Sequence, residues 1–238
     1  MHAILLAAGR GRRLEQKEPK CLLRIEDKTL LARHLENLSR AGVTSLTIVV
    51  GYEQQQIREF VGAMGKTPIP VSFIENPDFL RGSIVSLQKA SHLLVEGAIY
   101  MDADVIYPAA LMERLVRSKN DNCVLLDRRS DETGEEMMLG VKGGRVRAIA
   151  RRVAPMGPWD VTGEAVGFAK VGPEGGRALK RILDAEVEAG RLDQEYEAAM
   201  NIAFGEVAWG FEPVDDFAWT EIDFKEDVEK AEQLAKQL

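Results

Sequence analysis

Short apolar runs alternate with helix-like segments over the first 129 residues of the chain. Residues 3–8 form an unbroken apolar run that ends at Gly9, which is typical of a strand buried on both faces. Leucines recur at helical spacing in residues 29–41, and Gly42 marks the end of that helix. The same pattern predicts strands at residues 45–51, 69–76, 97–105 and 122–129, and helices at residues 52–62, 83–94 and 108–119. This alternation predicts an α/β fold with a mostly parallel, Rossmann-like sheet covered by helices on both faces.

The pattern changes after Arg129. Shorter strand-like pieces follow, and Gly143-Gly144 between the first two predicts a hairpin turn. We expect these pieces to form a small antiparallel β extension that lies over the parallel sheet. The pieces are residues 137–141, 145–150 and 164–171, followed by helices at residues 173–189 and 194–200, a strand at residues 207–213 and a closing helix at residues 225–238. No repeat or flexible linker interrupts the chain, so we expect a single domain over residues 1–238.

The composition fits an ordinary folded domain and disfavours two classes of partner. Of the 238 residues 45% are hydrophobic, which is enough for a sizeable core. The net charge is −7 and the basic residues form no cluster, so the chain would repel a nucleic-acid backbone, and we expect no nucleic-acid partner. No segment has the length of a membrane span or the form of a secretion signal, so we expect no membrane association. Cys21 and Cys123 are far apart in the sequence and next to apolar residues, which predicts buried, reduced thiols. Because reduced thiols are typical of a reducing compartment, we expect the chain to be cytoplasmic.

The stretch LAAGRGRRL, residues 6–14, follows the first apolar run directly. Its small residues let backbone N–H groups approach an anion closely. Arg10, Arg12 and Arg13 add fixed charges and forked donors that suit phosphate oxygens, and Lys20 follows near enough to reach back to a bound phosphate. These features favour a loop that holds a polyphosphate.

Two familiar phosphate loops do not fit this stretch. A Walker loop requires G-x-x-x-x-G-K-[ST], which occurs nowhere in the chain. The dinucleotide fingerprint fails because Leu14 occupies the position of its third glycine. A surface turn that happens to be basic stays open as the simpler alternative.

Two pairs of carboxylates are candidates for a metal site. Asp102 and Asp104 end a predicted parallel strand and project to the same side, where ligands of open α/β sheets bind. Glu221 and Asp223 stand on an extended segment just before the closing helix. Carboxylate oxygens are the ligands that a phosphate-bound Mg²⁺ prefers. The structural alternatives are helix capping by the strand-end aspartates and an N-cap role for Asp223.

LAAGRGRRL followed by PKCLL resembles the signature of nucleotidyltransferases that join a nucleoside triphosphate to a phosphorylated small molecule. That signature is usually written L-A-A-G-x-G-[ST]-R with a downstream P-K. Arg12 stands at its Ser/Thr position, which puts a side-chain hydroxyl contact in doubt, while Arg13 and Lys20 match its basic pair. The resemblance implies a metal site for Mg²⁺ at Asp104 and Asp223, supported by Glu221, and a catalytic role for Lys20 and Arg13. It also implies that the nucleotide is bound by Leu6, Ala7, Ala8, Gly9, Arg10, Gly11, Arg12, Arg13, Lys20, Ser83 and Asp102.

Two further segments resemble the compact cytidylyltransferases that activate phosphocholine, phosphonates or inositol phosphate. Residues 75–87, ENPDFLRGSIVSL, match a segment that contributes to base and acceptor binding, and residues 162–170, TGEAVGFAK, match one that lines the acceptor side. The implied division is a nucleotide-binding part at residues 1–129, an acceptor-binding part at residues 130–220 and a closing helix at residues 221–238. The residues expected to bind the acceptor, chosen for the charge of their side chains, are Arg81, Arg129, Glu164 and Glu197, of which Arg81 and Glu164 lie in these two segments.

The implied reaction is attack by an acceptor phosphate or phosphonate on the α-phosphorus of CTP, with release of pyrophosphate. The acceptor stays open, because arginines would suit an anion, carboxylates would suit an amine, and choline would need an aromatic cage in a chain with only 6% aromatic residues. The arginines are Arg81, Arg128 and Arg129, and the carboxylates are Glu164, Glu197 and Asp160. The alternatives are a sugar-1-phosphate nucleotidylyltransferase that uses UTP or dTTP, and a nucleotide-binding regulatory module without turnover. The sequence is compatible with a homodimer but does not determine the oligomeric state.

Overall fold

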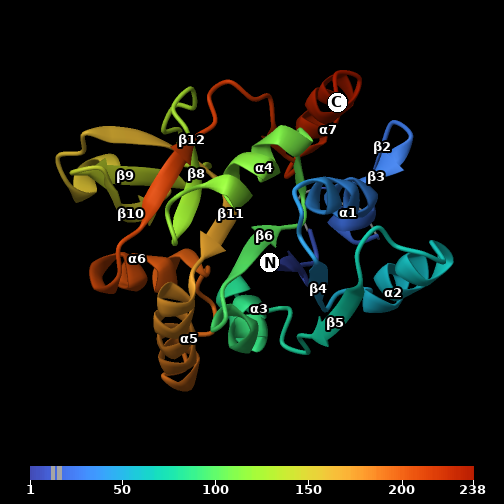
Figure 1. Cartoon of the computed structure of the whole chain (residues 1–238), viewed down its shortest axis with the longest axis horizontal. Coiled ribbons are helices and arrows are strands. Elements are labelled where there is room, and N and C mark those ends of the chain that lie inside the picture. The colour runs from blue at the N-terminus through green and yellow to red at the C-terminus, as the bar shows by residue number, and fades with distance from the viewer. Residues whose placement is uncertain (12–13, 15–17) are drawn as a thin grey trace.

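The computed structural model describes residues 1–11, 14 and 18–238, and a nine-stranded β-sheet of these residues forms its centre (Figure 1). Four parallel strands lie in the order β6, β1, β4, β5. Their bounds are β1 His2–Ala7, β4 Ser45–Val50, β5 Val71–Glu75 and β6 Ala98–Asp102. The expected mostly parallel α/β sheet is therefore confirmed.

The rest of the sheet comes from the second half of the chain. Its strands are β8 Cys123–Asp127, β9 Met138–Lys142, β10 Arg145–Ala150, β11 Val161–Val171 and β12 Gly210–Pro213. β11 runs antiparallel to β6, β8 and β9, and the predicted hairpin joins β9 to β10 through Gly143 and Gly144, both at positive φ. The extension does not lie over the parallel sheet as expected. It continues the sheet at its edge, because β11 is hydrogen-bonded directly to β6.

Helices cover both faces of this sheet. One face carries α3 (Ser83–Ala90), α5 (Pro173–Glu188) and α6 (Glu197–Glu206), and the other carries α1 (Leu30–Arg40), α2 (Gln54–Ala63) and α4 (Ala109–Arg117). β1 shows how the sequence divides the two cores. Ile4 packs into the first core and Ala3 and Leu5 into the second, because successive side chains of a strand point to opposite faces.

Two helices differ from the expected ranges. The helix expected at residues 83–94 changes after Ala90 to a 3₁₀ turn, and the helix expected at residues 194–200 is α6, which begins and ends later. Residues 192–194 form a turn and a bend instead of a helix, and their carbonyls accept hydrogen bonds from the start of α3, with the Ile84 N–H donating to the Gln194 carbonyl at 3.2 Å. Short 3₁₀ helices occur at Lys20–Leu22 (η2), Ser91–Leu94 (η3) and Ala154–Met156 (η4).

Two small strand pairs near the C-terminal helix were not indicated by the sequence pattern. β2 (Arg24–Ile25) pairs with β3 (Lys28–Thr29), and β7 (Val105–Ile106) pairs antiparallel with β13 (Thr220–Glu221). The C-terminal helix α7 (Lys225–Ala235) packs in a separate apolar cluster that includes Ile25, Ile106 and Ile222. Figure 1 shows α7, in red, beside α1 and the blue β2–β3 hairpin. Among the described residues, no helix combines the length and apolarity needed to cross a membrane.

Ile222, which connects β13 to α7, is fully buried. We expect Ile222→Ala to lower the free energy of unfolding by about 2–4 kcal/mol, because the truncation removes buried contacts and leaves a cavity. Urea denaturation followed by circular dichroism measures the loss. Val228→Ala is the matched control, since Val228 is a partly buried residue of α7 against the same cluster, and it should cost about 1 kcal/mol or less. Equal losses at the two positions would contradict the burial assigned to Ile222.

Candidate active site

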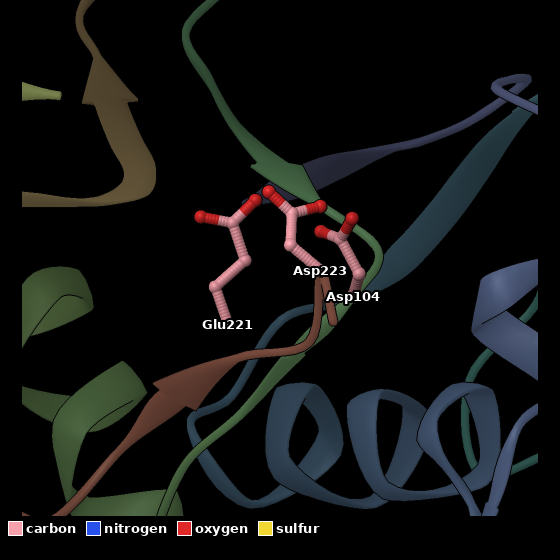
Figure 2. A group of neighbouring side chains, drawn as sticks. All are labelled: Asp104, Glu221 and Asp223. Atoms are coloured by element: carbon pink, nitrogen blue, oxygen red, sulfur yellow. The ribbon is translucent and has the colours of Figure 1, made fainter. Parts of the chain in front are cut away.

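The pairing of β7 with β13 brings together three carboxylates that are far apart in the sequence. Asp104 lies between β6 and β7, Glu221 ends β13, and Asp223 follows it by two residues. The Ile222 N–H donates to the Asp104 carbonyl at 2.9 Å, so the two segments are joined through their backbones at this point. One oxygen from each carboxylate lies within 4.8 Å of the others, and Figure 2 shows the three groups side by side and reaching in the same direction.

Lys20 supplies a positive charge to this acidic cluster. It begins η2, and its Nζ donates to Asp104 Oδ2 at 2.8 Å and to Asp223 Oδ1 at 2.5 Å. Burial by itself would lower the pKa of Lys20, but the charges and hydrogen bonds of the two aspartates outweigh it and raise this pKa above its usual value. Lys20 is therefore a fixed cation at every physiological pH.

One lysine does not balance the negative charge around it. Glu221 is exposed at the edge of the cleft, yet desolvation by the surrounding protein atoms, followed by the charges of Asp104 and Asp223, raises the pKa of its carboxyl well above the usual range. Burial and the charges of Asp104 and Glu197 do the same to the pKa of Asp102. A divalent cation would relieve this crowding, and carboxylate oxygens are the ligands that hard cations prefer. The Asp104, Glu221 and Asp223 side chains thus fit a divalent metal ion.

The acidic cluster lies in a cleft of about 560 Å³. This cleft opens where β1 and β6 end and where α3 and α6 begin, at the carboxyl edge of the parallel strands. The predicted site residues that line it are Leu6, Arg81, Ser83, Asp102, Asp104, Glu197, Glu221 and Asp223. The structure therefore brings together predicted nucleotide-binding, acceptor-binding and metal-binding residues.

The glycine-arginine loop borders a smaller hollow of about 120 Å³ beside the cleft. Leu6 and Asp104 line both spaces, and the hollow is also lined by Ala7, Gly9, Gly11 and Lys20. Ala8 is buried, and its carbonyl accepts a hydrogen bond from the Tyr52 N–H at 3.0 Å. Arg10 is exposed, and its guanidinium carbon lies 5.7 Å from the centre of the Tyr52 ring. Arg12 and Arg13 fall outside the described residues, so their predicted contacts stay predictions.

Arg129 and Glu164 lie elsewhere, around a separate hollow of about 370 Å³ that meets the cleft only at Glu221. The Arg129 guanidinium donates to Asp127 Oδ2 at 2.6 Å and to the Phe217 carbonyl at 2.6 Å. The Glu164 carboxylate accepts a hydrogen bond from the Ser130 hydroxyl. Of the other residues considered for the acceptor, Arg128 pairs with Asp215 and Asp160 with Lys142. None of these four side chains lines the main cleft.

Several cleft residues carried no functional signal in the sequence. Tyr196 is buried, and its hydroxyl donates to Asp102 Oδ2 at 2.7 Å. Tyr100, Glu135, Arg151 and Glu195 also line the cleft. The run of polar and aromatic residues from Glu195 to Glu197 was the available indication, but only Glu197 in it was predicted to bind the acceptor.

A parallel sheet that presents a glycine-rich loop, a lysine and an acidic cluster at its carboxyl edge has the arrangement of an enzyme that binds metal-associated phosphates. The sequence model of the MobA-like NTP transferase domain matches residues 3–164, which is more than half of the chain. The chain belongs to this family of nucleotidyltransferases.

Known proteins resemble the chain over different lengths. The bifunctional IPC transferase and DIPP synthase of Rubrobacter xylanophilus is 33% identical over 60% of this chain and 33% of its own length. The CMP-5'-(3-aminopropyl)phosphonate synthase of Streptomyces rubellomurinus is 24% identical over 98% of this chain and 38% of its own length. The chain therefore spans a third to two fifths of these curated relatives. The solved CTP:phosphocholine cytidylyltransferase of Streptococcus pneumoniae has the same fold, with a TM-score of 0.75, 20% identity and 98% of each chain covered.

Gly11 makes room for Lys20. Its φ is +59°, and a Cβ built there would lie 2.8 Å from the Lys20 Cγ. We expect Gly11→Ala to lower pyrophosphate release from nucleoside triphosphates on the order of tenfold or more, because the lysine stem must move away from the acidic cluster. Gly143→Ala is the matched control: it has the same φ of +59° and open space around its Cβ. Both variants should lose about 1 kcal/mol of stability in denaturation, and only Gly11→Ala should lose activity. Equal activities would contradict the contact.

Glu197 should make the stability of the protein depend on pH. Burial, with the charge of Glu195 adding to it, raises the pKa of Glu197 from 4.5 to about 7. A carboxyl group whose pKa is raised by folding stabilises the fold while it is protonated, and this stabilisation is lost as the pH rises from about 4.5 to about 7. We therefore expect Glu197→Gln to be more stable than the wild type at pH 8 by about 2–3 kcal/mol, and about equally stable near pH 4.5. Melting temperatures across this pH range measure the difference, and a destabilised variant at pH 8 would disprove the assignment.

Proposed function

We propose that the chain transfers a cytidylyl group from CTP to the phosphate or phosphonate of a small molecule and releases pyrophosphate. The observation that carries this proposal is the meeting of the N-terminal loop, Lys20 and the acidic cluster around adjoining cavities. The choice of CTP and of this acceptor class is supported by the relatives, one of which is named a phosphonate-CMP synthase and another a CTP:phosphoglutamine cytidylyltransferase.

In this proposal the loop binds the triphosphate. Backbone N–H groups around Gly9 and Gly11 approach the phosphates, and Arg13 grips the β- and γ-phosphates. Ser83 and Asp102 lie on the nucleoside side of the cleft. Lys20 neutralises the α-phosphate or the acceptor oxygen next to it, and its bonds to two aspartates hold the ammonium group in place. Ala8 acts through its backbone, since its side chain is buried.

Mg²⁺ is the proposed metal ion, held by Asp104 and Asp223 with support from Glu221. When bound, it neutralises phosphate charge and orients the triphosphate. Two unit charges 4 Å apart interact by about 1 kcal/mol in water and about 4 kcal/mol in a partly screened site, so two anions do not approach without countercharge. Lys20 and the loop arginines supply the rest of that countercharge.

The reaction needs no general base. A phosphate or phosphonate oxygen is already ionised near pH 7, so it attacks the α-phosphorus directly while the bond to the pyrophosphate oxygen breaks. The site then has to position two anions and neutralise them. Arg81 and Glu197 lie in the cleft where an acceptor would bind, whereas Arg129 and Glu164 could take part only through the neighbouring hollow.

The metal assignment can be tested with Asp104→Asn and Asp223→Asn. Each variant should lower CTP-dependent pyrophosphate release on the order of 10²-fold or more and raise the Mg²⁺ concentration needed for half-maximal rate, because each removes a charged ligand. Asp184→Asn is a suitable control, since Asp184 pairs with Lys180 on α5 and lies outside the cleft. Rates near wild type for both cleft variants would remove the metal assignment.

The choice of CTP is tested in the same assay. CTP with phosphonate or phosphate acceptors should support turnover, and UTP or dTTP with hexose 1-phosphates should not. The reverse preference would overturn the cytidylyl assignment, and nucleotide binding without any pyrophosphate release would indicate a regulatory module.

A further inference from the structure

We propose that the acceptor carries a primary ammonium group and that Glu197 and Tyr100 bind this group in the cleft. The inference rests on the proposed function and names the chemical class of the second substrate. In this proposal the phosphate or phosphonate end of the acceptor lies at the acidic cluster, and its ammonium end lies at the start of α6.

Two buried polar atoms at this place have no hydrogen-bond partner among the described residues. They are Glu197 Oε2 and the Tyr100 hydroxyl, and both residues line the cleft. Tyr100 is only 1% exposed. A buried polar atom without a hydrogen-bond partner lowers the stability of the fold by about 1–3 kcal/mol. Such atoms are therefore uncommon unless a ligand supplies the missing hydrogen bond. Two of them in one cleft indicate a subsite for a group that donates hydrogen bonds.

Both residues reach the same cleft, Tyr100 from β6 and Glu197 from the first turn of α6. The Tyr100 ring packs against the ring of Tyr196, the residue just before Glu197. In agreement with this placement, the charge of Glu197 contributes, after burial, to a raised pKa of Tyr100. Tyr100 and Asp102 point to the same face of β6, and the Tyr100 backbone lies about 7 Å further back along the strand, at about 3.3 Å per residue. The ammonium subsite is therefore further from the carboxyl end of β6 than the acidic cluster is, and a short alkyl chain of the acceptor can connect the two.

The charges that line the cleft favour a cation at this subsite. Its two arginines are already engaged, Arg151 with Glu195 at 2.9 Å and Arg81 with Asp193 at 3.2 Å. The described carboxylates that line it are Asp102, Asp104, Glu135, Asp193, Glu195, Glu197, Glu221 and Asp223. An acceptor with a second negative group would be repelled here, and an uncharged alkyl group would leave Glu197 buried and unpaired.

The hydrogen-bonding pattern selects among cations. A primary ammonium group has N–H donors for both Glu197 Oε2 and the Tyr100 oxygen. A trimethylammonium group has none and would leave both atoms without a partner. The Tyr196 hydroxyl also lies near Glu197, but it has a single proton, which it donates to Asp102 Oδ2, so it does not supply the donors that this subsite lacks. The nearby rings of Tyr100 and Tyr196 lie edge to face at 5.5 Å between centroids.

Matched acceptors test the proposal. Pyrophosphate release with CTP and Mg²⁺ is measured for 2-aminoethylphosphonate against ethylphosphonate, for phosphoethanolamine against phosphocholine, and for 3-phosphonopropionate as an anionic analogue. We expect kcat/KM for each amine to exceed that of its partner on the order of 10²-fold, because a site built around hydrogen-bond acceptors rejects analogues without donors. Glu197→Gln should remove most of this preference, mainly through KM.

Misfolding would not explain such a loss, because Glu197→Gln is expected to be more stable than the wild type at pH 8. Glu212→Gln is the matched control: Glu212 lies on β12, accepts a hydrogen bond from the Ser118 hydroxyl at 2.6 Å and does not line the cleft. It should keep the full preference for amines. Tyr100→Phe should weaken the preference without abolishing turnover.

The outcomes separate the two proposals. Turnover that is equal or better with ethylphosphonate, phosphocholine or 3-phosphonopropionate overturns the ammonium subsite and leaves the cytidylyl transfer standing. So does an equal loss for all acceptors in Glu197→Gln. Absence of pyrophosphate release with every acceptor overturns the proposed function, and the ammonium subsite with it.

Discussion

The site depends on a very short piece of antiparallel backbone. β7 and β13 are two residues each, yet their pairing fixes the segment that carries Glu221 and Asp223 against the loop that carries Asp104. The three carboxylates would repel one another in an open chain. Burial of Ile222 beneath α7 and the bonds from Lys20 to two of the carboxylates oppose that repulsion. The fold therefore holds three carboxylates close together at a place where they can bind a cation.

The cleft is chemically divided along β6. Near its carboxyl end, Lys20, the loop and the acidic cluster form a place for phosphate and metal charge. Further from that end, Tyr100 on β6 and Glu197 on α6 each have a polar atom with no hydrogen-bond partner in the part of the chain that the structure describes. Such atoms lower the stability of the fold. The raised pKa of Glu197 has the same origin, because burial also disfavours the charged form of its carboxyl group. If the missing partner is a group of the substrate, the bound substrate supplies these hydrogen bonds, and the free energy that their absence costs the empty protein is recovered on binding.

Much of the fold could be predicted from local pattern. β1 follows from an unbroken apolar run and β4 from a segment rich in β-branched residues. The Gly143-Gly144 turn was predicted because a Gly-Gly pair between two strands is typical of a hairpin, and both residues have a positive φ. The position of the extension could not be predicted in this way. Whether β11 lies over the sheet or beside β6 depends on edge pairing between distant strands, which residue spacing does not encode. The late start of α6 has a similar cause, since the preceding residues bond to α3.

The sequence alone determined the chemistry that is available: a small-residue loop, a following lysine and two acidic pairs, each of a type that binds phosphate or metal. It could not determine which acceptor residues share the cleft. The tertiary structure placed Glu197 there and Arg129 in a neighbouring hollow, although both had been predicted to bind the acceptor because of their charge. It also revealed that the buried Tyr100 hydroxyl has no hydrogen-bond partner among the described residues. The reason is physical: residue type fixes what a side chain can bind, whereas burial and the neighbours that satisfy or fail to satisfy it arise only when distant segments pack together.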